Sequence, residues 1–510
     1  MTTTHHPEKR TARLLTWAAV IIALAWVLSK LLVVIVVDVG NRRLSRAEYP
    51  EVLHLQKPAP APYPDRVKWW AHARFGLFIH WGPASLTGEE ISWSRGEGRP
   101  IPAETYDNLY KDFNPSRFDP KEWVDLARAA GMGYVVFTAK HHDGFCMFDT
   151  ALSPYKITNS PFGRDVAGEL SSACHDADLP FGFYYSLPDW RHADYDTEHH
   201  ERYLEYVKGQ VRELCTRYGP VDVFWFDNPA YAYAGDDPDV RKSAADWDAD
   251  SLFDLIRSTQ PDALANDRAG LPGDFDTVEQ EVGEFQAERP WEAAITLGAQ
   301  WSWKPDDAVM TLRQCVGTLV RVAGRDGNLL LNVGPMPTGE IEPRQAQRLR
   351  EIGLWLDRFG DTIRGTRGGP FAPGPWGAST QKDNRVYIHV LNWRSGIIQF
   401  PPFAGKRIAR SSILTGGEIR IEQTPTRVTI RIPKTSWDPI DTILLLNLEP
   451  ENGEKRVREK GVTEKRGQQR KGVRTIFGGG AVTFGRATRS FDRGSALWEH
   501  IIGCRCLPAN

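Results

Sequence analysis

The sequence places histidine, aspartate and arginine side chains at the ends of several short apolar runs. His80 is the next-to-last residue of FGLFIHW, and Asp227 is the last residue of VDVFWFD. His141 and His142 follow YVVFTAK, and Arg268 follows ALAND. Imidazole, carboxylate and guanidinium groups held together can move protons, stabilise charge and bind hydroxyl groups. If the ends of these runs converge, the residues predict a catalytic site.

Each of these residues has a plainer interpretation when it is taken alone. His80 beside Trp81 is typical of a hydrogen-bonded core residue, and Asp227 could cap the helix that follows it. Tyr184 and Tyr185 fit either a core or a site. A catalytic role for Asp227 is favoured by its position at the end of a strand that is rich in aromatic residues.

The adjacent pair His141-His142 raises the question of a metal site. Adjacent residues on a strand point to opposite faces, which works against one ion between them. The sequence has no H-x-H or H-E-x-x-H spacing. We therefore expect neither a metal nor a cofactor.

Glycoside hydrolysis requires two carboxyl groups, one to attack or position water and one to protonate the leaving oxygen. Asp227 is the natural first carboxyl group, and the second must come from a different loop. The candidates are Glu279 in FDTVEQEV, Glu292 in RPWEAAIT, Glu89 and Glu90. Spacing alone does not choose among them.

The apolar runs also predict the scaffold that positions these side chains. They are rich in β-branched and aromatic residues and alternate with helical patterns, as buried parallel strands do. Such an alternation over about 300 residues favours an α/β fold with a (β/α)8-like barrel, and a doubly wound sheet is the alternative. The predicted strands cover 75–81, 134–140, 181–187, 221–227, 263–267 and 328–334.

Two helices have clear start and stop signals. Asp119, Pro120 and Glu122 form the N-terminal pattern of the first, with a capping box, and Gly131 is placed to end it. The second starts at Pro343, carries an apolar stripe and stops at Gly360.

The 510 residues allow two or three domains, and the hydrophobic period marks where they change. After about residue 370 the period becomes two, which predicts a small antiparallel β-sandwich. The predicted divisions are an N-terminal segment 1–40, a Pro-rich spacer 41–64, a catalytic domain 65–369, a β-sandwich 370–450 and a basic, disordered tail 451–510.

The N-terminal segment contains the apolar run 14–37, interrupted by Ser29 and Lys30. About 20 apolar residues span a bilayer, which favours an uncleaved anchor, while Ala23-Leu24-Ala25 fits the cleavage site of a signal peptide. Lys and Arg residues are balanced on the two sides of this run, so they do not settle the orientation of an anchor. Glycans lie outside the cytoplasm, so a chain that hydrolyses glycosides is expected to be extracytoplasmic, anchored or secreted. The net charge of −2 argues against a nucleic-acid partner.

Seven motifs, in order, resemble the α-L-fucosidases of glycoside hydrolase family 29. They are FGLFIHWG, TAKHHDGFCMFD, FGFYYSLPDW, VDVFWFDN, NDRAG, RPWEAAIT and DGNLLLNVGPMPTG, between residues 75 and 339. The resemblance implies a retaining exo-α-L-fucosidase that needs no metal and acts on fucosylated oligosaccharides or glycoconjugates through a glycosyl-Asp227 intermediate. It leaves the oligomeric state open.

The resemblance also implies roles for other residues. Glu279 matches the general acid/base of some relatives and Glu292 that of others, and we place Glu279 first. The implied sugar-binding residues are His80, Trp93, His141, His142, Tyr185, Arg268 and Trp301.

The chain departs from the family pattern in two places. Asn228 follows the nucleophile where glycine is usual, and Ser92 precedes Trp93 where a glutamate is common, so Glu90 is the candidate replacement. These changes keep open a glycosidase of the same mechanism that acts on an L-galactoside or sulfated fucose. A non-catalytic carbohydrate-binding protein of the same fold is a separate alternative.

Overall fold

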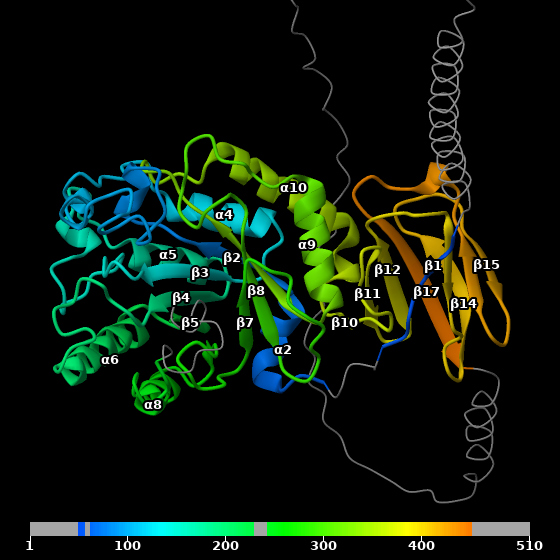
Figure 1. Cartoon of the computed structure of the whole chain (residues 1–510), viewed down its shortest axis with the longest axis horizontal. Helices are drawn as coiled ribbons and strands as arrows, with labels where there is room; N and C mark the ends of the chain where they lie inside the picture. The colour runs from blue at the N-terminus through cyan, green and yellow to red at the C-terminus, as the bar shows by residue number, and fades with distance from the viewer. Residues whose placement is uncertain (1–48, 57–61, 229–241, 451–510) are drawn as a thin grey trace, which may run out of the picture. The chain divides into compact units, whose positions relative to one another are not determined.

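The computed structural model describes residues 49–56, 62–228 and 242–450 (Figure 1). The apolar run 14–37 and the tail 451–510 lie outside these residues. Among the helices of the described ranges, none is long and apolar enough to cross a membrane. The anchor, the cleavage site and the tail therefore stay predictions.

Eight parallel strands form the first sheet, in the order β6-β5-β4-β3-β2-β9-β8-β7. Each strand pairs with its sequence neighbour, β2 pairs with β9, and a parallel bridge between Asn266 and Phe275 joins β6 to β7. The sheet therefore closes into a barrel, and the doubly wound alternative is wrong. The strands are β2 (Phe75–Ile79), β3 (Val135–Lys140), β4 (Phe181–Ser186), β5 (Val223–Asp227), β6 (Leu264–Ala265), β7 (Asp276–Glu279), β8 (Trp291–Thr296) and β9 (Asn328–Val333).

Helices separate most of these strands, as the sequence predicts. Within the described residues, the β6–β7 and β7–β8 connections contain no helix, so the barrel is a reduced version of the eightfold pattern. The helices of this domain are α2 (Asp65–Ala73), α3 (Ala103–Tyr106), α4 (Pro120–Ala129), α5 (Val166–Asp176), α6 (His200–Arg217), α8 (Ala249–Thr259), α9 (Leu312–Gly324) and α10 (Pro343–Phe359).

The predicted signals of α4 and α10 hold with one difference. The Asp119 side chain caps α4 by accepting from the Lys121 N–H at 2.8 Å, so the predicted box with Glu122 is not the bond that forms. Gly131, just past the end of α4, has the positive φ of 74° that favours glycine. Gly360 follows the last residue of α10.

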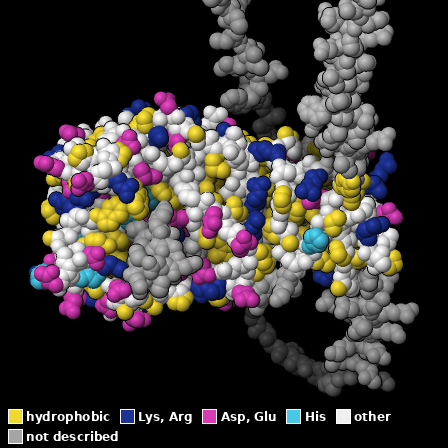
Figure 2. Space-filling model, in the orientation of Figure 1, with side chains coloured by type: hydrophobic (Ala, Val, Ile, Leu, Met, Phe, Trp, Pro, Cys, Tyr) yellow, Lys and Arg dark blue, Asp and Glu magenta, His cyan; other side chains and the backbone are white. Residues whose placement is uncertain are grey.

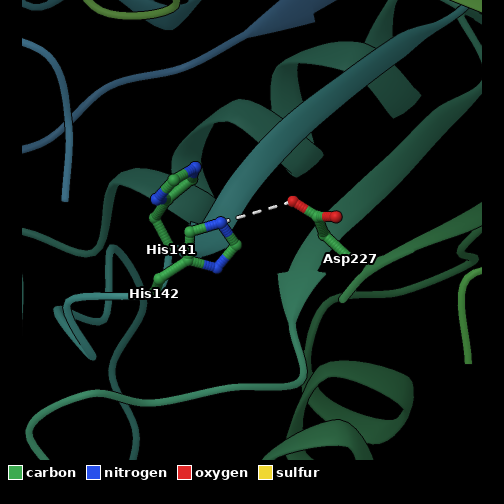
Figure 3. A group of neighbouring side chains, drawn as sticks. All are labelled: His141, His142 and Asp227. Carbon is green, nitrogen blue, oxygen red and sulfur yellow. Dashed lines mark ion pairs between the residues drawn. The ribbon is translucent and has the colours of Figure 1, made fainter. Parts of the chain in front are cut away.

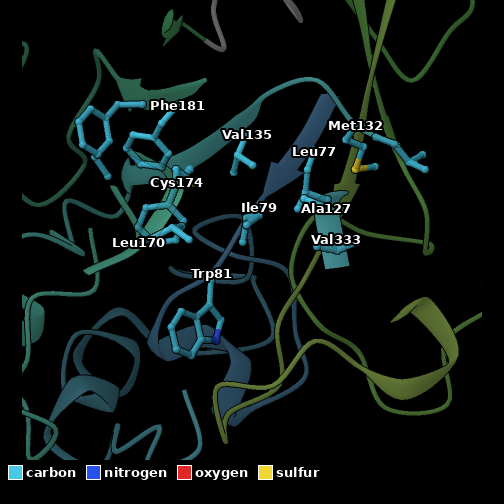
Figure 4. Close-up of a cluster of buried hydrophobic side chains, with 14 of the residues drawn as sticks. Leu77, Ile79, Trp81, Ala127, Met132, Val135, Leu170, Cys174, Phe181 and Val333 are labelled. Carbon is cyan, nitrogen blue, oxygen red and sulfur yellow. The ribbon is translucent and has the colours of Figure 1, made fainter. Parts of the chain in front are cut away.

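Side-chain alternation divides the barrel into an outer and an inner core. Leu77, Ile79 and Val135 face the helices and pack with α4 and α5 (Figure 4). Phe78 and Trp225 belong to the inner cluster, which Val67 and Trp70 of α2 also join. Because every second residue points inward, each strand contributes to the interior in layers from its amino end to its carboxyl end.

Residues 367–450, together with a short strand near residue 51, form two further sheets around a separate core. One has the order β1-β13-β16-β15 and the other β10-β11-β12-β17-β14; the pairs are antiparallel except β1–β13. The strands are β1 (Glu51–Val52), β10 (Arg367–Gly368), β11 (Gly377–Lys382), β12 (Arg385–Val390), β13 (Ile397–Phe400), β14 (Lys406–Ile413), β15 (Arg420–Gln423), β16 (Val428–Arg431) and β17 (Thr442–Pro450). The predicted sandwich is present, and the segment predicted as a spacer supplies its strand β1.

Charged side chains of both signs are interspersed over the face in Figure 2. Basic groups do not gather there into a single large patch, in keeping with the near-neutral net charge.

Candidate active site

A small pocket lies at the carboxyl ends of the barrel strands. Its walls combine aromatic rings with titratable groups, and they come from β2, β4, β5 and β7 and from the segments that follow β2, β3 and β8. The lining residues are Phe78, His80, Trp93, His141, His142, Tyr184, Trp225, Asp227, Glu279 and Trp301.

Asp227, the last residue of β5, is held on both carboxylate oxygens. The Tyr184 hydroxyl donates to Oδ2 at 2.7 Å, and Nη1 of Arg268 lies 3.4 Å from Oδ1. Asp227 is 8% exposed, so the pocket is its route to a ligand. A carboxylate held on both oxygens has a fixed orientation, as a nucleophile requires.

Glu279, the last residue of β7, lies next to the same arginine. Nη1 of Arg268 is 2.9 Å from Glu279 Oε1, and Nε donates to Thr277 Oγ1 at 2.7 Å. Burial, together with the nearby charge of Asp227, raises the pKa of Glu279 to about 7, although Arg268 acts in the opposite direction. Glu279 can therefore carry a proton near neutral pH, as a general acid must.

Glu292, the other candidate acid, lies elsewhere in the barrel. It pairs in register with Thr277 of β7 and Asn328, the first residue of β9, so it belongs to the layer at the amino ends of the strands. Its carboxylate accepts from the Tyr134 hydroxyl and, at 3.0 Å, from the Trp225 indole N–H. It is fully buried and does not line the pocket. The structure thus brings Glu279 and not Glu292 beside Asp227.

His141 and His142 lie just beyond β3, with ring centroids 4.1 Å apart (Figure 3). The chain turns here at Gly144, whose φ is +80° and whose position for a Cβ is filled by the Asp189 carboxylate. The strand-alternation argument against a shared ion is wrong, because β3 ends at Lys140.

Within the part of the chain that the structure describes, one group of side chains could hold a metal ion by position. Ligand atoms of His141, His142 and Asp227 lie within 4.8 Å of one another. The guanidinium of Arg268 beside Asp227 is a fixed positive charge that opposes a cation there.

The three pocket histidines are neutral near pH 7 because burial disfavours their charged forms. It lowers the pKa of His80 to about 3 and of His142 to about 4, and that of His141 well below its usual range. Neutral imidazoles with one ring nitrogen toward the pocket are suited to binding hydroxyl groups.

Tyr184, and not Tyr185, lies beside Asp227. The Tyr185 hydroxyl donates to Gln210 Oε1 of α6 at 2.8 Å, on the outer side of β4. The assignment of Tyr185 to the sugar site is corrected by one residue, since neighbours on a strand face opposite sides.

Two loops form the aromatic rim of the pocket. Trp93 contacts His142 edge-to-face, with ring centroids 5.6 Å apart, and the ring centroids of Trp301 and His80 are 4.7 Å apart. Ser92, at the position of the missing glutamate, forms a 2.6 Å hydrogen bond with Nδ1 of His141.

Glu90 does not replace that glutamate in the pocket. Its Oε2 accepts from the Trp301 N–H at 2.8 Å, and its Oε1 accepts from the Ile91 and Ser302 N–H groups at 2.9 and 3.0 Å. Glu90 therefore clamps the loop after β2 to the loop after β8, and its contribution to the site is the placement of Trp301.

Phe78 and Trp225 also line the pocket, although neither is among the site residues predicted from the sequence. Both lie two residues before a predicted site residue, His80 and Asp227, and inward-facing positions recur every second residue. The alternation of inward-facing residues along a strand could therefore have identified both residues from the sequence.

Comparison with known proteins identifies relatives of this chain. The family model described as Alpha-L-fucosidase matches residues 57–361. The tissue alpha-L-fucosidase of Rattus norvegicus is 28% identical over 415 residues, which cover 72% of this chain and 86% of that protein.

Solved structures agree with this match. Alpha-L-fucosidase isoenzyme 1 from Paenibacillus thiaminolyticus is 36% identical, with a TM-score of 0.67 over 76% of this chain and 99% of its own. A GH29 alpha-L-fucosidase from Bacteroides thetaiotaomicron, trapped as a covalent intermediate with 2-fluoro-fucosyl fluoride, is 26% identical, with a TM-score of 0.66 over 78% of this chain and 98% of its own.

Proposed function

Because this chain belongs to the alpha-L-fucosidase family of glycoside hydrolases, we propose that it is a retaining exo-α-L-fucosidase that removes terminal α-L-fucosyl groups from glycans. The observation that carries the proposal is the shared contact of Asp227 and Glu279 with one guanidinium nitrogen of Arg268, in the pocket.

The separation of the two carboxyl groups supports retention. Oδ1 of Asp227 and Oε1 of Glu279 lie 3.4 and 2.9 Å from the same nitrogen, so the two distances together set an upper limit on the gap between these oxygens. That limit is below the about 6.5 Å at which the range for inverting enzymes begins. This spacing favours direct attack by the Asp227 carboxylate over the water-mediated attack of an inverting enzyme.

Hydrolysis would proceed in two displacements. In the first, the Asp227 carboxylate bonds to the anomeric carbon while Glu279 gives its proton to the departing glycosidic oxygen. In the second, the Glu279 carboxylate takes a proton from water, whose oxygen displaces Asp227 from the sugar. Glu279 ends protonated again, and two inversions leave the α configuration unchanged.

Arg268 supports both forms of the pair. Its charge stabilises the Asp227 anion, and it also stabilises Glu279 once that group has lost its proton. The aromatic walls, Trp225 below the guanidinium and Trp301 at the rim, exclude water and give the sugar apolar contact.

The stereochemical outcome tests the proposal. The chain is incubated with 4-nitrophenyl α-L-fucoside, and proton NMR follows the anomer that forms first. The α anomer of fucose supports the proposal, and the β anomer contradicts it. Binding of fucose without turnover would instead support the non-catalytic alternative.

A fucose-like sugar is the second candidate substrate, and Ser92 is the observation that favours it. The Ser92 hydroxyl forms a hydrogen bond with His141 at the position where many family members have a glutamate carboxylate. The polar groups that face the sugar beside His141 therefore differ from those of these family members. A panel of aryl α-L-fucoside, α-L-galactoside and sulfated fucoside separates these candidates by kcat/KM.

We also propose an extracytoplasmic location, anchored or secreted. The apolar run 14–37 and the extracellular location of most glycans support it. Protease treatment of intact cells that express the full chain tests this location, since an intracellular protein would be protected.

A further inference from the structure

The hydrogen bond behind His142 determines which of its ring nitrogens carries the proton. Nδ1 lies 2.7 Å from Ser186 Oγ, and the Ser186 hydroxyl donates to the Pro188 carbonyl oxygen at 2.6 Å. A carbonyl oxygen can only accept, so the single hydroxyl proton of Ser186 is used there. Ser186 Oγ must therefore accept from His142, and Nδ1 of His142 carries the hydrogen.

Lys140 strengthens this arrangement from behind. Its Nζ donates to the same Pro188 oxygen at 3.2 Å and lies 4.6 Å from the centroid of the Tyr185 ring. Two donors on one buried carbonyl keep that oxygen in place, so the Ser186 proton retains its acceptor.

His80 receives its proton assignment from Asn332 in the same way. Nδ2 of Asn332 donates to the Trp301 carbonyl at 2.7 Å, which identifies the other amide atom as the oxygen. That oxygen lies 2.7 Å from Nδ1 of His80 and can only accept. His80 therefore also carries its hydrogen on Nδ1.

We propose that Ser186 and Asn332 are positioning residues that hold His142 and His80 as Nδ1–H tautomers, so that Nε2 of each accepts a hydrogen bond from a sugar hydroxyl. The inference rests on the proposed function and deepens it, because it assigns the direction of two substrate contacts. Neither Ser186 nor Asn332 lines the pocket, so both act through the imidazoles.

The geometry around Asp227 shows what this tautomer does. Nε2 of His142 lies 3.5 Å from Asp227 Oδ2 (Figure 3), and both atoms are acceptors when the imidazole is neutral with its hydrogen on Nδ1. Two acceptors that face each other favour a ligand that brings a donor to them. A hydroxyl beside the reacting carbon supplies that donor, whereas the Nε2–H tautomer would satisfy Asp227 without substrate.

Replacing the acceptor of Ser186 tests this directly. Ser186→Ala removes the partner of Nδ1–H and leaves Asp227 to draw the hydrogen to Nε2. We expect kcat/KM for 4-nitrophenyl α-L-fucoside to fall by roughly 10- to 100-fold, the scale known for loss of a group that orients a metal-binding histidine. Ser186→Cys, whose thiol is a weak donor and acceptor, makes the same test if the alanine variant does not fold.

Ser171→Ala is the matched control. Ser171 is also buried and donates to a backbone carbonyl, that of Tyr218 at 2.6 Å, but it belongs to α5 on the outside of the barrel. The control should lose a similar amount of stability and retain kcat/KM.

Mono-deoxy substrates supply the decisive comparison. One of the 2-, 3- and 4-deoxy aryl fucosides lacks the hydroxyl that donates to His142, and on that substrate Ser186→Ala should cost less than threefold. An equal loss on all substrates, or a loss under threefold on the parent fucoside, overturns the proposal.

Nitrogen NMR of the protein labelled with 15N-histidine reads the tautomer itself. The wild type should show a histidine protonated at Nδ1 that changes in Ser186→Ala and not in Ser171→Ala; an Nε2–H form of His142 in the wild type overturns the proposal. A wild type without activity on any of these glycosides would overturn the proposed function instead, so the two failures are distinct.

Discussion

The two ends of the barrel each contain a glutamate whose pKa is raised to about 7, partly buried in the case of Glu279 and fully buried in that of Glu292. At the carboxyl end, Glu279 contacts the charged Arg268 and lines the pocket with Asp227. At the amino end, Glu292 is surrounded by neutral donors, the Tyr134 hydroxyl and the Trp225 indole. Burial is the largest cause of the shift at both ends.

The difference shows that a raised pKa does not by itself identify a general acid. Glu279 can lose a proton during catalysis because Arg268 stabilises the anion, and a substrate in the pocket can reach it. No cation contacts Glu292 among the described residues, so its anion is uncompensated. We therefore expect substitutions at the carboxyl end to reduce activity and substitutions at the amino end to change mainly stability.

The largest effect should come from Asp227→Gly at the carboxyl end. Without the nucleophile, kcat for 4-nitrophenyl α-L-fucoside should fall by at least about 10³-fold while the protein remains folded. Sodium azide should enter the space left by the carboxylate and form the β-fucosyl azide, which NMR detects. Activity near that of the wild type without azide would remove Asp227 from its role.

The second effect should come from Glu279→Ala. Loss of a general acid costs about 10²- to 10⁴-fold when the leaving group needs a proton. We therefore expect large losses on fucosylated oligosaccharides and small ones on fucosides with an acidic phenol as leaving group. Equal losses on both would mean that the acid lies elsewhere.

The pH profile sharpens this test. Glu279 must be protonated to act, so kcat/KM of the wild type should decline as the pH rises through about 7, the raised pKa of this group. Glu279→Ala should lose this alkaline limb and Glu292→Gln should keep it. An unchanged limb in Glu279→Ala contradicts the assignment.

At the rim of the pocket, Glu90→Gln should have a smaller effect. The amide oxygen can replace Oε1, which accepts from the Ile91 and Ser302 N–H groups, but the amide N–H₂ must then face the Trp301 N–H. The bond lost is the one that places Trp301, so we expect kcat/KM to fall about tenfold, mostly through KM. Glu89→Gln, the exposed neighbour, is the control and should change neither value.

Much of the barrel could be predicted because six strands are near-continuous apolar runs. The two that escaped, β7 and β8, carry Asp276 and Glu279 in the one case and Glu292 in the other, so their sequences do not read as buried strands. They also lack crossover helices before and between them, which removes the alternation that revealed the others.

Site residues at the ends of strands could be predicted from the sequence. Residues whose inward or outward orientation depends on the register of a strand were harder to predict. His80, Asp227 and Arg268 followed from position, whereas Tyr184 against Tyr185 depends on which of two adjacent residues points inward. The choice between Glu279 and Glu292 depends on depth along the barrel axis. Depth follows from the pairing of Glu279 with Ala294 and of Glu292 with Thr277, which no local pattern records.

The smallest effect on activity should come from Glu292→Gln at the amino end, and its main effect should be on stability. Raising the pKa of Glu292 from 4.5 to about 7 means that the folded state binds this proton more tightly than the unfolded state. The resulting stabilisation is fully present below pH 4.5 and is lost as the pH rises to about 7, a change on the order of 3 kcal/mol.

Glutamine resembles protonated glutamate at all pH values, because it is uncharged and its amide oxygen can accept from one of the two donors, Tyr134 or Trp225. Between pH 4.5 and 8 the free energy of unfolding of Glu292→Gln, measured with urea, should therefore decline less than that of the wild type. Because Glu292 does not line the pocket and is linked to it by the hydrogen bond from Trp225, kcat/KM should stay within tenfold on substrates with good and poor leaving groups alike. A loss that grows with the basicity of the leaving group, or a missing alkaline limb, would instead move the general acid to the amino end and reverse the comparison.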